Sequence, residues 1–385
     1  MKKYFIILAA SLGFALQAQE EEIEKPDLAQ QIEELDRHNQ NLNIYFNFQS
    51  SLDAVNTEEE TEVGFKARQL RLEIKGDLTD KLFYRFRHRL NRNNNAQSLD
   101  NLSKATDLMY AGYKFSDKVT VIAGKQCQAW GGFEFDINPM NIYEYSDFID
   151  NMDNFMLGAN LIVSPVENHE IQFQVTDSRN AKMEDIYGDL SSQGINPSNN
   201  PLTYILNWNG NLLNNKLQTR WAYGIQTQAE SNYSKMITIG NKLNLSNFQL
   251  AFDYMRADED IDRLGIATSY GEPYLSQNQM TRFEDVTYNT YIVKAEFQPN
   301  EKWNVFAKGS YETSSVKDVP EYDDNFRESY GYYAGLEHIP FKDQDLRIFL
   351  AYVGRNYKFN ENLAYLEDYN TNRVSVGIMY KIKAY

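Results

Sequence analysis

The sequence has little of what disulfide-stabilised proteins and most enzymes depend on. Its 385 residues include one cysteine, Cys127, so an intramolecular disulfide and a zinc site built from several thiolates are both excluded. The four histidines are scattered, and no HExxH, GxSxG or phosphate-binding glycine loop occurs. We therefore expect no enzymatic activity, no cofactor and no bound metal.

Long apolar segments are scarce as well. Lys2 and Lys3 precede an apolar run at residues 4–16, a pattern typical of a cleaved signal peptide that ends near Ala18. Beyond that run no stretch approaches the roughly 18 apolar residues of a membrane-spanning helix. The sequence therefore predicts export through a signal peptide over residues 1–18 and no helical membrane anchor.

The composition combines polarity with many aromatic side chains. Proline occurs only 9 times, whereas there are 27 tyrosines and 22 phenylalanines, and 24% of the residues are charged. These totals fit an outer-membrane barrel with a polar lumen and aromatic girdles, although a soluble secreted β-protein would fit them too. The net charge of −16 argues against nucleic acid as a partner.

Residues 19–40 form a short acidic segment before the main pattern begins. Leu28, Ile32 and Leu35 recur at coiled-coil spacing, but only for about two heptads. We interpret the segment either as a short periplasmic helix or as a solvated tail that leads into the following domain.

From residue 41 onward the hydrophobic period is two. Residues 81–91 show it clearly, because Leu82, Tyr84 and Phe86 share one face while Arg85 and Arg87 share the other. About sixteen runs of this kind follow one another, each about as long as a tilted membrane-spanning strand. The runs lie at residues 41–49, 70–75, 81–91, 106–115, 119–126, 155–164, 171–176, 202–209, 217–227, 235–243, 248–255, 286–297, 303–312, 329–339, 346–357 and 373–381.

The connections between these runs alternate in length. Short links, such as residues 77–80 and 116–118, alternate with long polar segments near 51–66, 92–105, 127–154, 178–201, 257–285, 313–327 and 358–370. This alternation predicts an all-β fold over residues 41–385, a transmembrane antiparallel up-and-down β-barrel with short periplasmic turns and long extracellular loops. Closure of the sheet also explains why proline is rare, since every ladder donor is needed.

The period also assigns faces, because an arginine at mid-bilayer costs about 2–4 kcal/mol and must point into the lumen instead. Lumenal acids are expected at Glu73, Asp253, Glu296, Glu312 and Glu337, and bases outnumber them. Rings of lumenal Arg or Lys favour anions, although such bases can also serve only to pair with neighbouring acids. The candidate pore-lining bases are Arg71, Lys75, Arg85, Arg87, Arg89, Lys114, Arg220, Lys294, Lys308, Arg347, Arg355, Arg373 and Lys381.

Three segments resemble one known family. "RQLRLEIKGDLTDKLFYRFRHRLNR" (68–92), "YAGYKFSDKVTVIAGKQ" (110–126) and "NRVSVGIMYKIKAY" (372–385) are similar to the phosphate-selective porin O/P family in order and spacing. The resemblance implies a sixteen-stranded trimeric porin in the outer membrane of a Gram-negative bacterium, which passes anions over lumenal bases. It also implies that loop 127–154 folds into the pore as a constriction.

That loop departs from the pattern of a phosphate-selective member, because residues 127–154 contain six acidic residues and no Lys or Arg. Phosphate selectivity is therefore not expected to follow from the loop. Its aromatic side chains are open to two interpretations: they stack on sugar rings in a constriction, or they pack the loop against the wall. The candidate constriction residues are Trp130, Phe133, Glu134, Asp136, Tyr143 and Asp147.

We hypothesise a porin for passive diffusion of small inorganic or organic solutes, either anion-preferring or general, because the acidic loop 127–154 leaves the sign of its selectivity open. Its expected partners are outer-membrane lipid, lipopolysaccharide and two further copies of the chain. The alternative is a barrel without a conducting channel that acts as an adhesin or scaffold through its long loops. The sequence does not identify the natural solute.

Overall fold

The computed structural model describes residues 41–57 and 60–385. The predicted signal peptide (1–18) and acidic segment (19–40) lie outside the described residues. No helix in the described part of the chain is long and apolar enough to cross a membrane.

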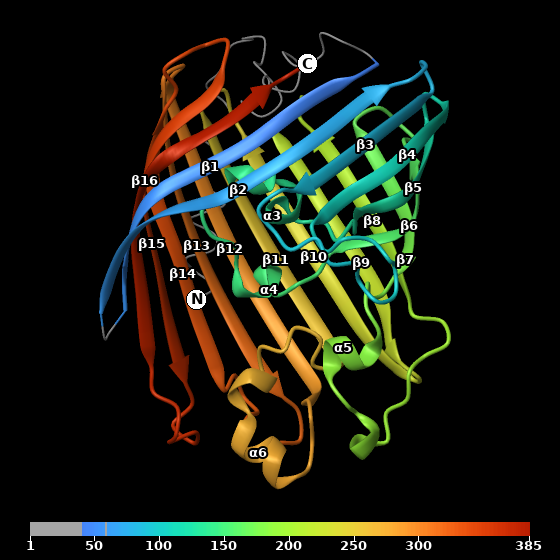
Figure 1. The fold of residues 1–385 in the computed structure, drawn as a ribbon, viewed down its shortest axis with the longest axis vertical. Coiled ribbons are helices and arrows are strands. Elements are labelled where there is room, and N and C mark those ends of the chain that lie inside the picture. Colours follow the sequence, from blue (N-terminus) through green and yellow to red (C-terminus); the bar gives the residue numbers. More distant parts are fainter. Residues whose placement is uncertain (1–40, 58–59) are drawn as a thin grey trace. The chain divides into compact units, whose positions relative to one another are not determined.

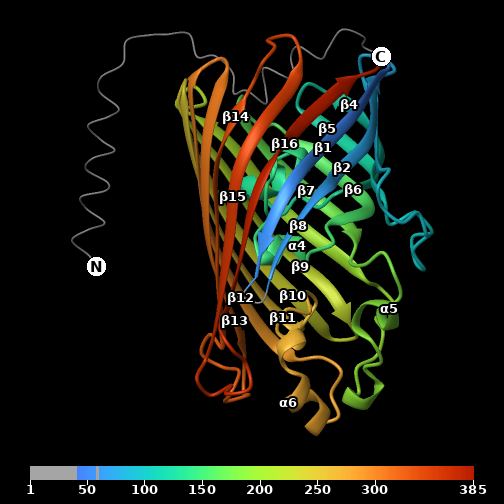
Figure 2. The same ribbon diagram turned by 60° about the vertical axis from the view of Figure 1, so that its left-hand side comes forward.

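Sixteen antiparallel strands form a closed barrel in which each strand pairs with its neighbours in sequence and β1 pairs with β16 (Figures 1 and 2). The all-β barrel predicted from the sequence is confirmed. The strands are β1 Asn43–Asn56, β2 Thr61–Asp77, β3 Leu82–Arg89, β4 Thr106–Ser116, β5 Val119–Cys127, β6 Phe155–Val163, β7 His169–Asp177, β8 Leu202–Leu212, β9 Leu217–Ala229, β10 Asn232–Asn244, β11 Phe248–Ile261, β12 Glu284–Asn300, β13 Trp303–Val316, β14 Arg327–His338, β15 Asp345–Phe359 and β16 Tyr369–Lys383.

The two faces of each strand meet different surroundings. Along β13, Val305 is 48% exposed, whereas the neighbouring Phe306 and Lys308 are buried. Side chains alternate across a strand, so the exposed apolar set faces lipid and the other set faces the interior. The interior is therefore where charged and polar side chains of this chain gather.

Each predicted strand run coincides with a strand, but the prediction of a long loop near 51–66 is wrong. The strands β1 and β2 continue to Asn56 and from Thr61, so only residues 57–60 connect them. The alternation persists in β1 beyond residue 50, with Leu52 exposed and Ser51 and Asp53 buried. The polar composition of this hairpin predicted a loop, but strand ends that lie beyond the hydrocarbon do not need apolar residues.

The remaining connections differ in length between the two ends of the barrel. Residues 78–81, 117–118 and 164–168 are short turns, whereas 90–105, 128–154, 178–201 and 262–283 are long segments. An exception at the long-loop end is the two-residue link at 230–231. The helices in the long segments are α3 Phe133–Asp136, η1 Pro139–Asn141, α4 Asp147–Asp150, α5 Met183–Tyr187, η2 Ser191–Gln193, η3 Thr268–Tyr270 and α6 Glu272–Gln277.

The hydrophobic core of the barrel lies within its lumen. Trp130 and Phe148, from the segment 128–154, pack with inward side chains of the wall such as Met236, Met255 and Tyr288. This core lies on the lumenal side of β8–β13.

Candidate functional site

The segment 128–154 between β5 and β6, called here the inner loop, lies inside the barrel with its helices α3 and α4 (Figure 1). The start of the inner loop packs closely against the backbone of β9. A Cβ atom at Gly224 of β9 would lie 2.4 Å from the Trp130 ring, so only glycine leaves room for the indole. Gly131 and Gly132 have φ of 71° and 75°, which turn the chain from this anchor into α3.

Two wall carboxylates receive the backbone N–H groups at the starts of the helices. Asp253 accepts hydrogen bonds from Phe133 N (2.8 and 2.9 Å) and Glu134 N (2.9 Å). Glu312 accepts them from Asp147 N (2.8 Å) and Phe148 N (3.0 Å). These donors have no partner within their own helices, so the two carboxylates fix the position of α3 and α4.

Tyr143 joins the middle of the inner loop to β13–β15. Its ring stacks on Phe306 with centroids 4.4 Å apart and meets Phe349 edge-on at 5.1 Å. Its hydroxyl donates to Glu337 at 2.8 Å. Burial, followed by the negative charge of Glu337, raises the pKa of Tyr143 far above its ordinary value, so the hydroxyl remains a donor.

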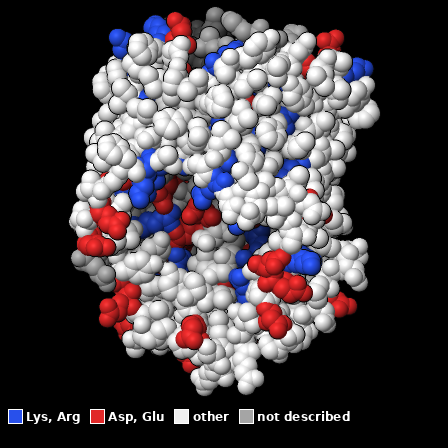
Figure 3. All heavy atoms as spheres, in the orientation of Figure 1, with Lys and Arg blue, Asp and Glu red and all other residues white. Residues whose placement is uncertain are grey.

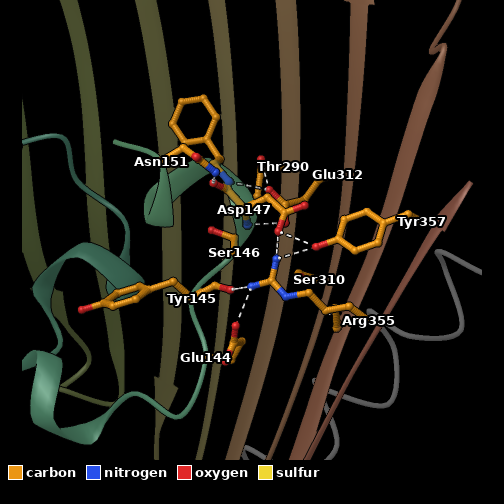
Figure 4. Close-up of polar contacts among 12 residues, drawn as sticks. Glu144, Tyr145, Ser146, Asp147, Asn151, Thr290, Ser310, Glu312, Arg355 and Tyr357 are labelled. Carbon is orange, nitrogen blue, oxygen red and sulfur yellow. Dashed lines mark hydrogen bonds and ion pairs between the residues drawn. The ribbon is translucent and has the colours of Figure 1, made fainter. Parts of the chain in front are cut away.

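The acids of the inner loop neutralise bases of the wall (Figure 4). Arg355 forms ion pairs with Asp147 and Glu144, and Glu144 also contacts Arg373 at 2.9 Å. In Figure 4 the Arg355 guanidinium lies between Asp147 and Glu144, and the Tyr357 hydroxyl approaches Asp147. Three further pairs are Lys308–Glu134, Arg327–Asp147 and Arg220–Asp136.

On β2–β4, positive charges outnumber negative charges. We call this cluster the arginine sector; it consists of Arg71, Arg85, Arg87, Arg89 and the carboxylates that pair with them. Arg87 and Arg89 donate to Asp107 at 3.1 and 2.7 Å, and Arg71 lies 3.2 Å from the same carboxylate. Three positive groups against one negative group leave two positive charges. Arg85 pairs with Glu73 at 2.7 Å and remains 30% exposed.

The inner loop extends across the lumen towards the arginine sector. Burial raises the pKa of Tyr145, and the positive charge of Arg71 partly offsets that effect. Gln69 of β2 donates to Pro139 O at 2.6 Å. The inner loop therefore contacts the strand that also carries Arg71.

The comparisons with known proteins agree with this geometry. The family model for phosphate-selective porin O and P matches residues 42–382. The chain belongs to this porin family. No curated relative matches the sequence.

Solved porins share the fold of this porin at low sequence identity. The outer membrane channel DcaP of Acinetobacter baumannii is 11% identical with a TM-score of 0.59, covering 89% of this chain and 97% of that chain. An anion-selective porin from Comamonas acidovorans is 11% identical (TM-score 0.57, 89% and 99%), and Salmonella typhi OmpF is 14% identical (0.59, 89% and 97%). Family and fold together make this chain an outer-membrane channel.

The predicted pore-lining bases of this porin differ in whether an acid neutralises them. Most are paired with acids: Arg71, Arg85, Arg87 and Arg89 in the arginine sector, Arg220, Lys308, Arg355 and Arg373 with the inner loop, Lys294 with Glu296, and Arg347 with Asp345 and Glu337. Lys75 and Lys381 lie over the Tyr45 ring, and Lys114 lies over the Phe83 ring.

The candidate aromatic residues of the inner loop are buried. Trp130, Phe133 and Tyr143 are 1%, 6% and 7% exposed, so their rings pack against the wall rather than present a face to a solute. Sequence reasoning did not identify Asp107 as a lumenal acid. Asp107 lies at the start of β4, outside the apolar–polar alternation of that strand. Sequence reasoning also missed the role of Gly224, although a small residue on an inward face signals close approach of another segment.

Proposed function

We propose that this porin conducts small solutes passively and prefers anions. The observation that carries the proposal is the sharing of one carboxylate, Asp107, by Arg71, Arg87 and Arg89. Elsewhere in the lumen the inner-loop acids compensate the bases, so the arginine sector is where positive charge exceeds negative charge. Lumenal excess of Arg attracts anions and repels cations.

The charge of the inner loop makes phosphate a weaker candidate than small anions in general. Its acids Glu144 and Asp147 already occupy Arg355 and Arg373, so these guanidinium groups are not available for bidentate phosphate binding. We propose that the arginine sector lines the passage instead, and that its partly exposed members Arg85 and Arg89 attract passing anions.

The test is the reversal potential of the purified porin in a planar bilayer under a KCl gradient. We expect a chloride-selective potential that moves towards zero in Arg89→Gln and further in Arg85→Gln/Arg89→Gln. Arg256→Gln is the matched control, because Arg256 is 44% exposed and paired with Asp258 away from the sector. A cation-selective wild type would contradict the anion preference. A folded barrel without conductance would favour the alternative of an adhesin or scaffold.

The remaining elements of the proposal concern targeting and assembly. We propose export through a cleaved signal peptide at residues 1–18, contact with lipopolysaccharide and a homotrimeric state. One solved neighbour, Vibrio cholerae OmpT (TM-score 0.54), is described as a trimer form, which supports the last point. The absence of enzymatic activity stays a prediction.

A further inference from the structure

Four tyrosines form a continuous row on the outward face of the barrel, which we call the tyrosine row. They occupy directly opposite positions on successive strands from β11 to β14, and the centroids of neighbouring rings lie 4.9, 6.2 and 5.0 Å apart. Aromatic rows of this kind mark the level at which a barrel wall leaves the hydrocarbon of the membrane. The four residues are Tyr254, Tyr291, Tyr311 and Tyr330.

The outward side chains change character across the tyrosine row. On its short-turn side, the next outward residues include Phe252 and Val293, which are 40% and 46% exposed. On its long-loop side, the next outward positions are polar or charged, so the tyrosine row separates a lipid-facing surface from a polar one. These positions, called here the polar row, are Arg256, Asn289, Thr313, Glu328 and Lys358.

Hydrogen bonds join the two rows. The hydroxyls of Tyr311 and Tyr330 donate to Glu328 at 2.8 and 2.7 Å, and the Tyr254 hydroxyl donates to Asn289 at 3.1 Å. The single proton of each of these hydroxyls is therefore used within the wall. A ligand that lies on the polar row meets its charged ends as the remaining strong donors.

Positive side chains stand at both ends of the polar row. At one end Arg256 is 44% exposed and pairs with Asp258 at 2.7 Å, and Lys235 of β10 occupies the position directly opposite Asp258. At the other end Lys358 is exposed and lies 5.6 Å from the centroid of the Tyr330 ring. Four strand spacings separate β11 from β15, so the backbones that carry Arg256 and Lys358 are about 19 Å apart.

Exposed acids are frequent elsewhere at the long-loop end of the barrel. Figure 3 shows Asp and Glu side chains gathered near the lower, long-loop end on the face that it presents. Glu184, Glu272 and Asp324 are exposed in three different loops. A phosphorylated lipid headgroup is repelled by these acids and attracted by bases at the membrane surface, which directs it to the ends of the polar row.

We infer that the polar row binds the phosphorylated glucosamine headgroup of lipopolysaccharide, with its phosphates at Lys235 and Arg256 on one side and at Lys358 on the other. The inference rests on the proposed contact with lipopolysaccharide and assigns that contact to the outward wall of β10–β15. The acyl chains lie below the tyrosine row, against the apolar wall. The amide and hydroxyl groups of Asn289 and Thr313 lie between the bases, where the sugar rings pass. Arg256 also provides the planar guanidinium that binds phosphate with two hydrogen bonds.

The experiment is a titration of the full-length porin in mild detergent with bisphosphorylated lipid A, the complexes being counted by native mass spectrometry. EDTA is present, so that no divalent cation links acids of the protein to phosphates. We expect Lys235→Gln/Arg256→Gln/Lys358→Gln to weaken binding at least about tenfold, because each base near a membrane surface contributes to the attraction of anionic headgroups. Glu328→Gln removes the acid directly opposite Lys358 and is expected to strengthen binding, which a misfolded variant would not do.

The matched control is Lys118→Gln/Lys302→Gln/Lys342→Gln, which removes three exposed bases from the short turns and is expected to bind lipid A as the wild type does. Unchanged binding by the triple variant of the polar row would overturn the inference. Equal binding of dephosphorylated lipid A or of phosphatidylglycerol would also overturn it. Bilayer conductance of the same variants separates this inference from the channel function, because the three substituted side chains lie on the outward face and conduction is expected to persist without them.

Discussion

Asp253 on β11 accepts hydrogen bonds from the backbone N–H of Phe133 with both of its carboxylate oxygens, at 2.8 and 2.9 Å. The two residues are 120 positions apart, and the contact joins the far wall to the first helix of the inner loop. Glu312 serves α4 in the same manner. These two lumenal acids thus hold the inner loop in place and do not simply lower the positive charge of the wall.

Replacing Asp253 with alanine should loosen α3 without removing the loop. The N–H groups of Phe133 and Glu134 lose their acceptor, which corresponds to the loss of a helix cap worth about 0.5–2 kcal/mol. We expect a lower midpoint of thermal unfolding and more frequent closures in single-channel recordings. Asp318→Ala, at an 82% exposed side chain, is the control. A closure frequency equal to that of the wild type would show that the other contacts of the inner loop hold it in place.

Two substitutions at Tyr143 separate its hydroxyl from its ring. Tyr143→Phe keeps the stacking on Phe306 and removes one hydrogen bond to Glu337, so we expect a loss of about 0.5–1.5 kcal/mol. Tyr143→Ala also empties a buried site and should cost about 3–5 kcal/mol. Denaturant unfolding followed by tryptophan fluorescence measures both. Equal losses would mean that the ring packing contributes nothing beyond the hydroxyl.

The strands could be predicted from the sequence, because a lipid-facing and a water-facing side impose a period of two on every strand. The same reasoning placed Arg85 and Arg87 on the lumenal face. It could not find Asp107, the shared partner of Arg71, Arg87 and Arg89. A register shift between Arg87 and His88 brings β4 into a position that alternation does not encode. Nor could it assign Asp253 and Glu312 to the inner loop, because their donors are backbone groups of a segment distant in sequence.

Asp107→Asn should change selectivity and stability in opposite directions. Removal of the carboxylate adds one positive charge to the lumen, so the permeability ratio of chloride to potassium should rise. Arg71 and Arg87 are 8% and 6% exposed and lose their counter-charge, which should destabilise the barrel by about 3–5 kcal/mol. Asp258→Asn, at a pair that is about half exposed, should change stability by less than about 1 kcal/mol. A lower chloride preference in Asp107→Asn would contradict the role of the arginine sector.

Gly224→Val tests whether the inner loop depends on close approach to the wall. The added side chain meets the Trp130 ring, where even a Cβ atom would lie at 2.4 Å, so the start of the loop must move into the passage. We expect a loss of stability of about 1–3 kcal/mol, as for other overpacked sites, together with a lower single-channel conductance.

The control for that change is Gly309→Val on β13, where an added Cβ has no neighbour within 4 Å. Because valine suits a strand that faces lipid, this variant should conduct as the wild type does. In the double variant Gly224→Val/Trp130→Ala the clash is absent, and the conductance should recover part of its loss even though the indole is missing. Recovery would show that the bulk of Trp130 against β9 sets the position of the loop, whereas no recovery would indicate that Gly224 matters to the strand itself.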